Sequence, residues 1–140
     1  MPLILDIEAA CRFVSGWFGW RDAQNGPLID QPFVVPPAIH ALNRHLGRLW
    51  HGAPPADLFT FQDRLIPPRD YAPDADGIVP ILWENQSVWG CGFKPGTGAQ
   101  LWVTGDWPDD HCGDAGWRAT SHRVDQAIIF ALLGNTVWAA

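Results

Sequence analysis

Residues 77–93 constrain the fold of this chain most, because two apolar runs meet there at a polar tetrad. The tetrad, residues 84–87, contains side chains that favour a solvated turn over a strand interior. After it, residues 88–93 alternate large side chains with Gly90 and Gly92, and strand geometry sends the two sets to opposite faces. The pattern predicts two antiparallel strands joined by a tight turn. The glycine face favours close packing over a ligand groove.

Apolar periodicity predicts two helices in the first half of the chain. In residues 5–18, apolar side chains recur at spacings of three and four, and Asp6 can cap the first turn. The proline-led residues 37–50 repeat this spacing. On the second helix, His40 and His45 do not share a face, so they do not form a pair of metal ligands.

Further strands and one more helix complete the expected elements. Short strands are expected at residues 33–35, 58–61 and 100–104. A last helix is expected from about residue 124, with Thr120 or Ser121 at its start and Gly134-Asn135 at its end.

Strands between terminal helices indicate an α+β fold, because no strand-helix-strand alternation requires a parallel sheet. We expect a central antiparallel sheet of about four to six strands, flanked by N-terminal and C-terminal helices. A chain of 140 residues with 47% hydrophobic content falls in the size range of one domain. Residues 1–140 are therefore predicted to form a single domain.

The cysteines and the apolar runs bear on the cellular compartment. Cys11, Cys91 and Cys112 are widely spaced and form no Cys-x-x-Cys pair, which argues against a disulfide framework or a zinc site. No apolar run reaches the roughly 18 residues of a membrane span, and Asp6 and Glu8 interrupt the region where a signal peptide would be apolar. The sequence predicts a soluble, cytoplasmic protein with free thiols, no cofactor and no membrane partner.

The net charge of −6 is concentrated in one part of the chain, residues 70–114. Lys94 is the one basic residue of this segment, which carries eight acidic residues: Asp70, Asp74, Asp76, Glu84, Asp106, Asp109, Asp110 and Asp114. An acidic surface repels nucleic acid and attracts a basic protein partner. It is equally consistent with a solvated surface that has no partner. The nine basic residues form no basic stripe, so direct nucleic-acid binding is not expected.

The order of these features resembles the SUKH superfamily, which comprises bacterial immunity proteins and fungal regulators of cell-wall synthesis. The family's proline-led helix is similar to residues 36–42, and its phenylalanine-bearing strand with a proline pair is similar to residues 59–68. Its turn followed by an aromatic strand looks like residues 84–89. Its tryptophan before the last helix, after an acidic proline-containing loop, looks like Trp117 after residues 107–114.

The resemblance implies an α+β fold and a non-catalytic role in binding and neutralising a cognate protein toxin. The acidic segment favours a basic toxin, such as a nuclease. Ser87 stands where the family usually has glycine, so the turn is expected to differ in type or in its positive-φ residue. The predicted partner-binding residues are Glu84, Asn85, Gln86, Asp106, Trp107, Asp109, Asp110 and Asp114. The oligomeric state stays open.

Two other classes of function stay open. A hydrolase could use His111 and Cys112 beside the carboxylates of residues 109–114, although adjacent residues rarely point at each other productively. The same carboxylates do not have the alternating spacing that the calcium ligands of a helix-loop-helix site have. A small-ligand or glycan-binding protein could stack its ligand on exposed tryptophans, for which the candidates are Trp17, Trp20, Trp50 and Trp107.

Overall fold

The computed structural model describes residues 6–22, 24–51, 59, 63–106 and 116–139. These residues form one five-stranded antiparallel sheet, three α-helices and two short 3₁₀ helices. The elements are, in chain order, α1 (Ile7–Phe18), α2 (Pro37–Leu46), η1 (Gly47–His51), β1 (Asp63–Leu65), η2 (Pro68–Asp70), β2 (Val79–Glu84), β3 (Trp89–Phe93), β4 (Gln100–Gly105), β5 (Arg118–Arg123) and α3 (Val124–Ala139). The predicted α+β class, with helices toward both ends of the chain, is confirmed.

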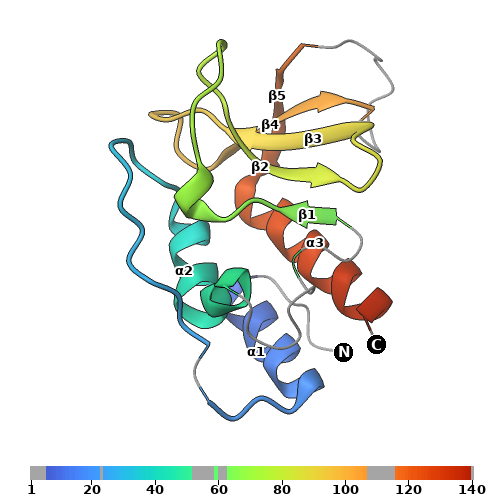
Figure 1. Cartoon of the computed structure of the whole chain (residues 1–140). Coiled ribbons are helices and arrows are strands. Elements are labelled where there is room, and N and C mark those ends of the chain that lie inside the picture. Colours follow the sequence, from blue (N-terminus) through green and yellow to red (C-terminus); the bar gives the residue numbers. More distant parts are fainter. Residues whose placement is uncertain (1–5, 23, 52–58, 60–62, 107–115, 140) are drawn as a thin grey trace.

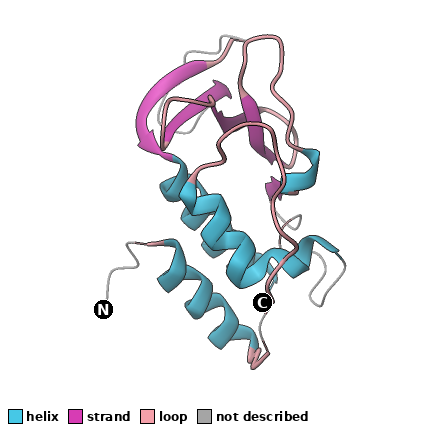
Figure 2. Cartoon of the chain, turned by 90° about the vertical axis from the view of Figure 1, so that its left-hand side faces the viewer, coloured by secondary structure: helices cyan, strands magenta, loops and turns pink. Residues whose placement is uncertain are grey.

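The helices lie together on one side of the sheet (Figures 1 and 2). The strand order β1-β2-β3-β4-β5 follows the sequence, so each strand pairs with the next by a direct antiparallel connection. α3 contacts β1, β3, β4 and β5, whereas α1 packs on α2 and α3. α3 therefore lies between the sheet and the first helix.

The predicted hairpin is present, and its second strand, β3, is buried along its whole length. Trp89, Cys91 and Phe93 face the helices together with Leu101 and Val103 of β4, which pair across the sheet with the same face of β3. These side chains join residues of α1, α2 and α3 in one hydrophobic core. Burial of this core supplies the main driving force for folding.

The opposite face of β3 carries Gly90 and Gly92, and each glycine is required by its neighbour across the sheet. A Cβ atom at Gly90 would collide with the indole ring of Trp83, and one at Gly92 would collide with the backbone carbonyl of Val79. The ring of Trp83 thus lies over the glycine of the next strand. The prediction that the glycine face serves close packing is confirmed at both positions.

Tryptophans form a second, smaller cluster on this glycine face. Trp83 and Trp117 lie with their ring centroids 6.1 Å apart. The Trp117 indole N–H donates to Asp74 Oδ2 at 2.6 Å, and Lys94 Nζ lies 5.4 Å from the centroid of Trp102. The face of the sheet away from the helices is therefore partly covered by side chains that come from β2, from β4 and from Trp117, the residue before β5.

The first two helices form where the sequence predicts them. Asp6 caps α1, because its Oδ1 accepts from the Ala9 N–H at 2.6 Å, and Gly19 ends the helix with a φ of +70°. α2 begins at Pro37 and continues into η1, so helical structure covers the whole predicted segment. His40 is exposed and His45 is partly buried.

One predicted short strand, at residues 33–35, is absent, and another, at residues 58–61, lies almost entirely outside the described residues. Residues 33–35 form no strand, because Pro32 and Pro36 on either side have no backbone N–H to donate to a neighbouring strand. Phe33 instead packs on Phe93, with the two ring centroids 6.1 Å apart. Of residues 58–61, only Phe59 lies in the described part of the chain. The edge strand that pairs with β2 is β1, which begins at Asp63, four residues after Phe59.

The last helix differs from its prediction at both ends. Thr120 and Ser121 lie in β5 and do not cap the helix. The helix starts at Val124, where the Gln126 side chain accepts from the Arg123 N–H at 2.8 Å, as in half of a capping box. It continues past Gly134 and Asn135 to Ala139.

Asn135 does not end α3 because its side chain makes tertiary hydrogen bonds. Its Oδ1 accepts from the Asp63 N–H at 3.1 Å, and its Nδ2 donates to the Asp63 carbonyl at 3.0 Å. Asn135 is 1% exposed. Its side chain makes the two backbone hydrogen bonds that a neighbouring strand would otherwise make with Asp63 of the edge strand β1. The C-terminal helix is thereby joined to the edge of the sheet.

We expect Asn135→Ala to lower the free energy of unfolding by about 3 kcal/mol, because it leaves a buried backbone donor and acceptor without partners. Asn25→Ala, at an exposed position, is the matched control and should change stability little. Urea denaturation of both variants measures the difference. A loss at Asn135 no larger than that at Asn25 would show that the Asn135–Asp63 pair does not stabilise the fold.

Candidate functional site

The structure brings two of the predicted binding segments together at one end of the sheet. The β2–β3 turn and the end of β4 lie side by side there, because β3 and β4 pair from Trp89↔Gly105 onward. The Asp106 N–H donates to the Val88 carbonyl at 3.2 Å, which fixes Asp106 beside the turn. We call this surface, formed by residues 84–88 and Asp106, the acidic sheet end.

The β2–β3 turn is held by the side chain of its first residue. Glu84 Oε2 accepts from the Gln86 N–H at 3.0 Å and from the Val88 N–H at 3.2 Å. The Ser87 N–H donates to the Glu84 carbonyl at 2.8 Å, and Ser87 adopts a φ of +59°. Ser87 therefore occupies the left-handed region that glycine adopts most easily, so the serine is accommodated without moving the positive φ to another residue of the turn.

A buried carboxyl group lies directly beneath the turn. Asp63 pairs with Glu84 in the register of β1 and β2 and is 7% exposed. Burial raises the pKa of the Asp63 carboxyl, and the Glu84 carboxylate raises it further, while a hydrogen bond from the Asn85 backbone lowers it. The sequence prediction missed Asp63, because an acidic residue between Gln62 and Arg64 has no local signal that distinguishes it from an exposed one.

The outer surface of the acidic sheet end is polar and exposed. Asn85 and Gln86 are exposed, as are Asp106 and the apolar side chain of Val88, whereas Glu84 is partly buried. The Glu84 carboxylate is occupied by turn hydrogen bonds, so its first role is to fix the backbone. The backbone of this surface is thus held in one conformation while its outer side chains face solvent.

The other predicted partner-binding residues, Trp107, Asp109, Asp110 and Asp114, lie outside the described residues, as do His111 and Cys112. The residues on either side of that segment, Asp106 and Gly116, lie at the ends of β4 and β5. Because β4 and β5 are antiparallel neighbours, both attachment points are at the same end of the sheet as the β2–β3 turn.

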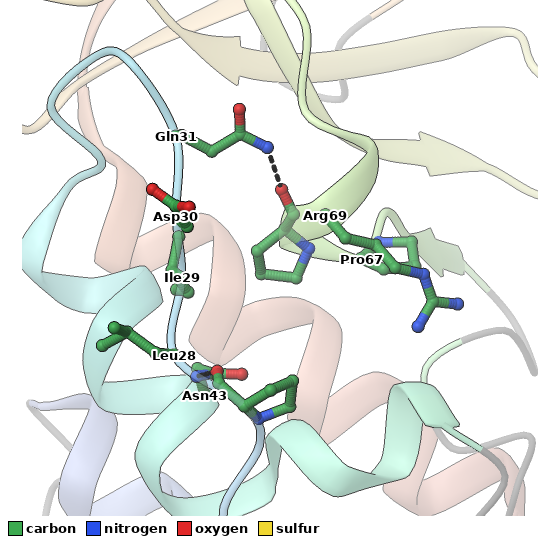
Figure 3. Close-up of a pocket in the computed structure, with 9 residues that line it drawn as sticks. Leu28, Ile29, Asp30, Gln31, Asn43, Pro67 and Arg69 are labelled. Carbon is green, nitrogen blue, oxygen red and sulfur yellow. Dashed lines mark hydrogen bonds between the residues drawn. The ribbon is translucent and has the colours of Figure 1, made fainter.

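A small pocket lies away from this surface, between an irregular loop and η2 (Figure 3). Gln31 Nε2 donates across it to the Pro68 carbonyl at 2.8 Å, and Asn43 Nδ2 donates to the Pro27 carbonyl at 2.7 Å. Its volume of about 210 Å³ is below the roughly 300–1,000 Å³ of ordinary ligand sites. These two hydrogen bonds attach the loop of residues 24–31 to η2 and to α2. The pocket is the space that remains between the loop and these elements.

The tryptophans proposed for ligand stacking contact different partners. Trp17 is exposed and lies beside Phe13, whereas Trp20 is partly buried and stacks on Phe18. The rings of Trp50 and Phe59 pack with their centroids 4.4 Å apart, and the Trp50 indole N–H donates to the Leu65 carbonyl. Trp50 is therefore a structural residue. Trp107 lies outside the described residues.

The two described cysteines are buried thiols. Burial raises the pKa of Cys11 to about 12 and raises that of Cys91 further, so both are protonated at neutral pH and are poor nucleophiles. Within the described ranges, no group of three or more His, Cys, Asp or Glu side chains is placed to hold a metal ion. None of the helices in the described part of the chain has the length and apolar character to span a membrane.

We expect Ser87→Gly to raise the free energy of unfolding by about 1 kcal/mol, because glycine adopts a positive φ without the Cβ clash. The matched control is Ser121→Gly, since Ser121 is exposed in extended strand β5, where glycine is destabilising. Thermal denaturation distinguishes the two. Equal destabilisation by both substitutions would contradict the turn geometry.

Asp63→Asn should stabilise the protein in a pH-dependent way. A carboxyl whose pKa is raised on folding favours the folded state below its unfolded pKa of roughly 4, and this stability is lost as the pH rises through the folded pKa. The amide keeps an acceptor for the Asn85 N–H. The advantage of the variant over the wild type, measured by urea denaturation, should therefore grow between acidic and neutral pH. A difference that is independent of pH would contradict the raised pKa.

Comparison of the chain with models of protein families, with curated proteins and with solved structures finds no match in any of the three.

Proposed function

We propose that this chain is a non-catalytic protein-binding module of the immunity type, which binds and neutralises a basic protein toxin in the cytoplasm. The observation that carries the proposal is the hydrogen bond between the Asp106 N–H and the Val88 carbonyl, which joins an exposed acidic residue to the exposed turn. The resemblance of residues 36–42, 59–68 and 84–89 to the SUKH superfamily supports the same type of function.

The acidic sheet end suits protein recognition for two physical reasons. Its turn is fixed by two hydrogen bonds to Glu84 and one to the Glu84 carbonyl, so little conformational entropy is lost when a partner binds. Asp106 and the acidic residues of segment 70–114 favour the approach of a basic surface, and charge complementarity mainly raises the association rate. Val88 adds an apolar group among these polar ones.

The test uses the product of a toxin gene that neighbours the gene for this chain. We expect the two purified proteins to form a stoichiometric complex, and co-expression to restore growth that the toxin alone stops. The double variant Gln86→Lys/Asp106→Lys should weaken the complex at least about tenfold, mainly through slower association and a smaller dependence on salt.

Asp70→Lys is the matched control, because Asp70 is also exposed and acidic but lies in η2. This control should retain most of the affinity. Equal losses in the control and in the double variant would show that net charge alone matters. The absence of any complex with a neighbouring toxin would contradict the immunity proposal.

A further inference from the structure

α3 lacks the polar outer face that a surface helix normally has. Its sequence, from Val124 to Ala139, contains one charged residue, Asp125 in the first turn. Phe130 is nevertheless 59% exposed and Val137 is 73% exposed. A helix that is apolar on all sides is normally covered on all sides. The outer side of α3 is thus an apolar surface without a cover among the described residues.

The exposed residues of α3 in the described part of the chain, Gln126, Phe130 and Val137, form one stripe that is apolar after the first turn. Phe130 and Val137 are seven residues apart, which is about two helical turns, so they lie on the same side of the helix. Leu133 lies between them and is partly buried. Buried Asn135 points the other way, toward β1, so the stripe faces away from β1.

α1 adds a second exposed apolar pair beside α3. Phe13 is 44% exposed and Trp17 is 57% exposed, and their ring centroids are 6.1 Å apart. On the opposite flank of α1, the Glu8 carboxylate forms a salt bridge with Arg44 of α2, with 3.0 Å between Glu8 Oε1 and Arg44 Nη2. At about 100° per residue, Phe13 and Trp17 lie on the flank of α1 away from α2. Because α1 packs against both α2 and α3, this is its α3 side.

We infer that these exposed side chains form a symmetric interface with a second copy of this chain. We call the surface the helical patch, and its members are Phe13, Trp17, Phe130, Leu133 and Val137. Two-fold dimers are the commonest protein assemblies, and they place the same surface patch of each subunit against the other.

The size of the helical patch fits this partner. From the exposed fractions, its apolar surface is about 450 Å², which is within the roughly 300–600 Å² of the largest apolar patch on a typical monomer, a patch that is often functional. A standard interface buries about 800 Å² on each partner, and about 65% of it is apolar in homodimers. The patch therefore supplies most of the apolar area that one subunit of a stable dimer needs.

The distribution of charge also favours a second copy. Beyond Asp125 the outer stripe of α3 carries no charge, so an identical patch can face it without like-charge repulsion. A strongly charged partner would find no complementary group on that stripe. The acidic residues Glu84 and Asp106 lie on the sheet and would remain outside this interface. The dimer is thus independent of toxin binding and would present two acidic sheet ends.

Sedimentation velocity over a wide range of protein concentration tests the inference. The wild type should change from one chain to a particle of twice that mass as its concentration rises. Phe130→Glu should raise the dissociation constant of the dimer at least about tenfold, since it places a charge at the centre of an apolar contact. Ala72→Glu adds the same charge at an exposed loop position and should leave the dimer unchanged.

Trp17→Gln provides a second variant on the other helix, and circular dichroism of each variant verifies that the fold is intact. We expect Trp17→Gln to weaken the dimer as well. A wild type that stays monomeric at the highest concentration would overturn the inference. A dimer that survives both Phe130→Glu and Trp17→Gln would also overturn it, because its interface would then lie elsewhere.

Discussion

The structure depends on the close packing of β2 against β3 at two positions without side chains. Gly90 makes room for the ring of Trp83, and Gly92 makes room for the backbone at Val79, just before the pairing of β2 and β3 shifts register between Pro80 and Leu82. Because of this fit, β3 is buried on both faces and is the centre of the sheet. The helices cover one face of the sheet, and a tryptophan cluster partly covers the other.

This central strand also determines where the candidate site lies. The same pairing that buries β3 brings the β2–β3 turn next to the end of β4, so that Val88 and Asp106 share a hydrogen bond. β1 adds the buried Asp63 beneath the turn, and Asn135 fastens β1 to α3. The acidic sheet end is thus continuous with the core, which explains how a surface turn can be rigid.

The sequence predicted those parts of the fold that depend on local patterns. The hairpin, the Asp6 cap and the proline-led helix follow from turn chemistry, side-chain capping and apolar spacing, and all three are present. Local chemistry was sufficient at these positions because tertiary contacts act in the same direction. The positive φ of Ser87 was not predicted, because the serine led us to expect a turn of another type or with its positive φ elsewhere.

The prediction was wrong where a distant partner decides the local structure. Gly134-Asn135 has the composition of a helix end, yet Asn135 lies inside α3 because Asp63, 72 residues away, binds its side chain. Thr120 and Ser121 have the composition of a cap, but pairing with β4 holds them in β5. No single-sequence pattern reports such pairings, and the same reason explains why Asp63 was missed.

The measurement that tests the acidic sheet end most directly is hydrogen–deuterium exchange of this chain alone and in complex with the toxin encoded beside it. We expect the largest gain of protection on binding at residues 84–88 and at Asp106, with little change in η2 or on the outer side of α3. Protection confined to the helices, or to the pocket at residues 27–31 and 67–69, would contradict the assignment of the binding surface.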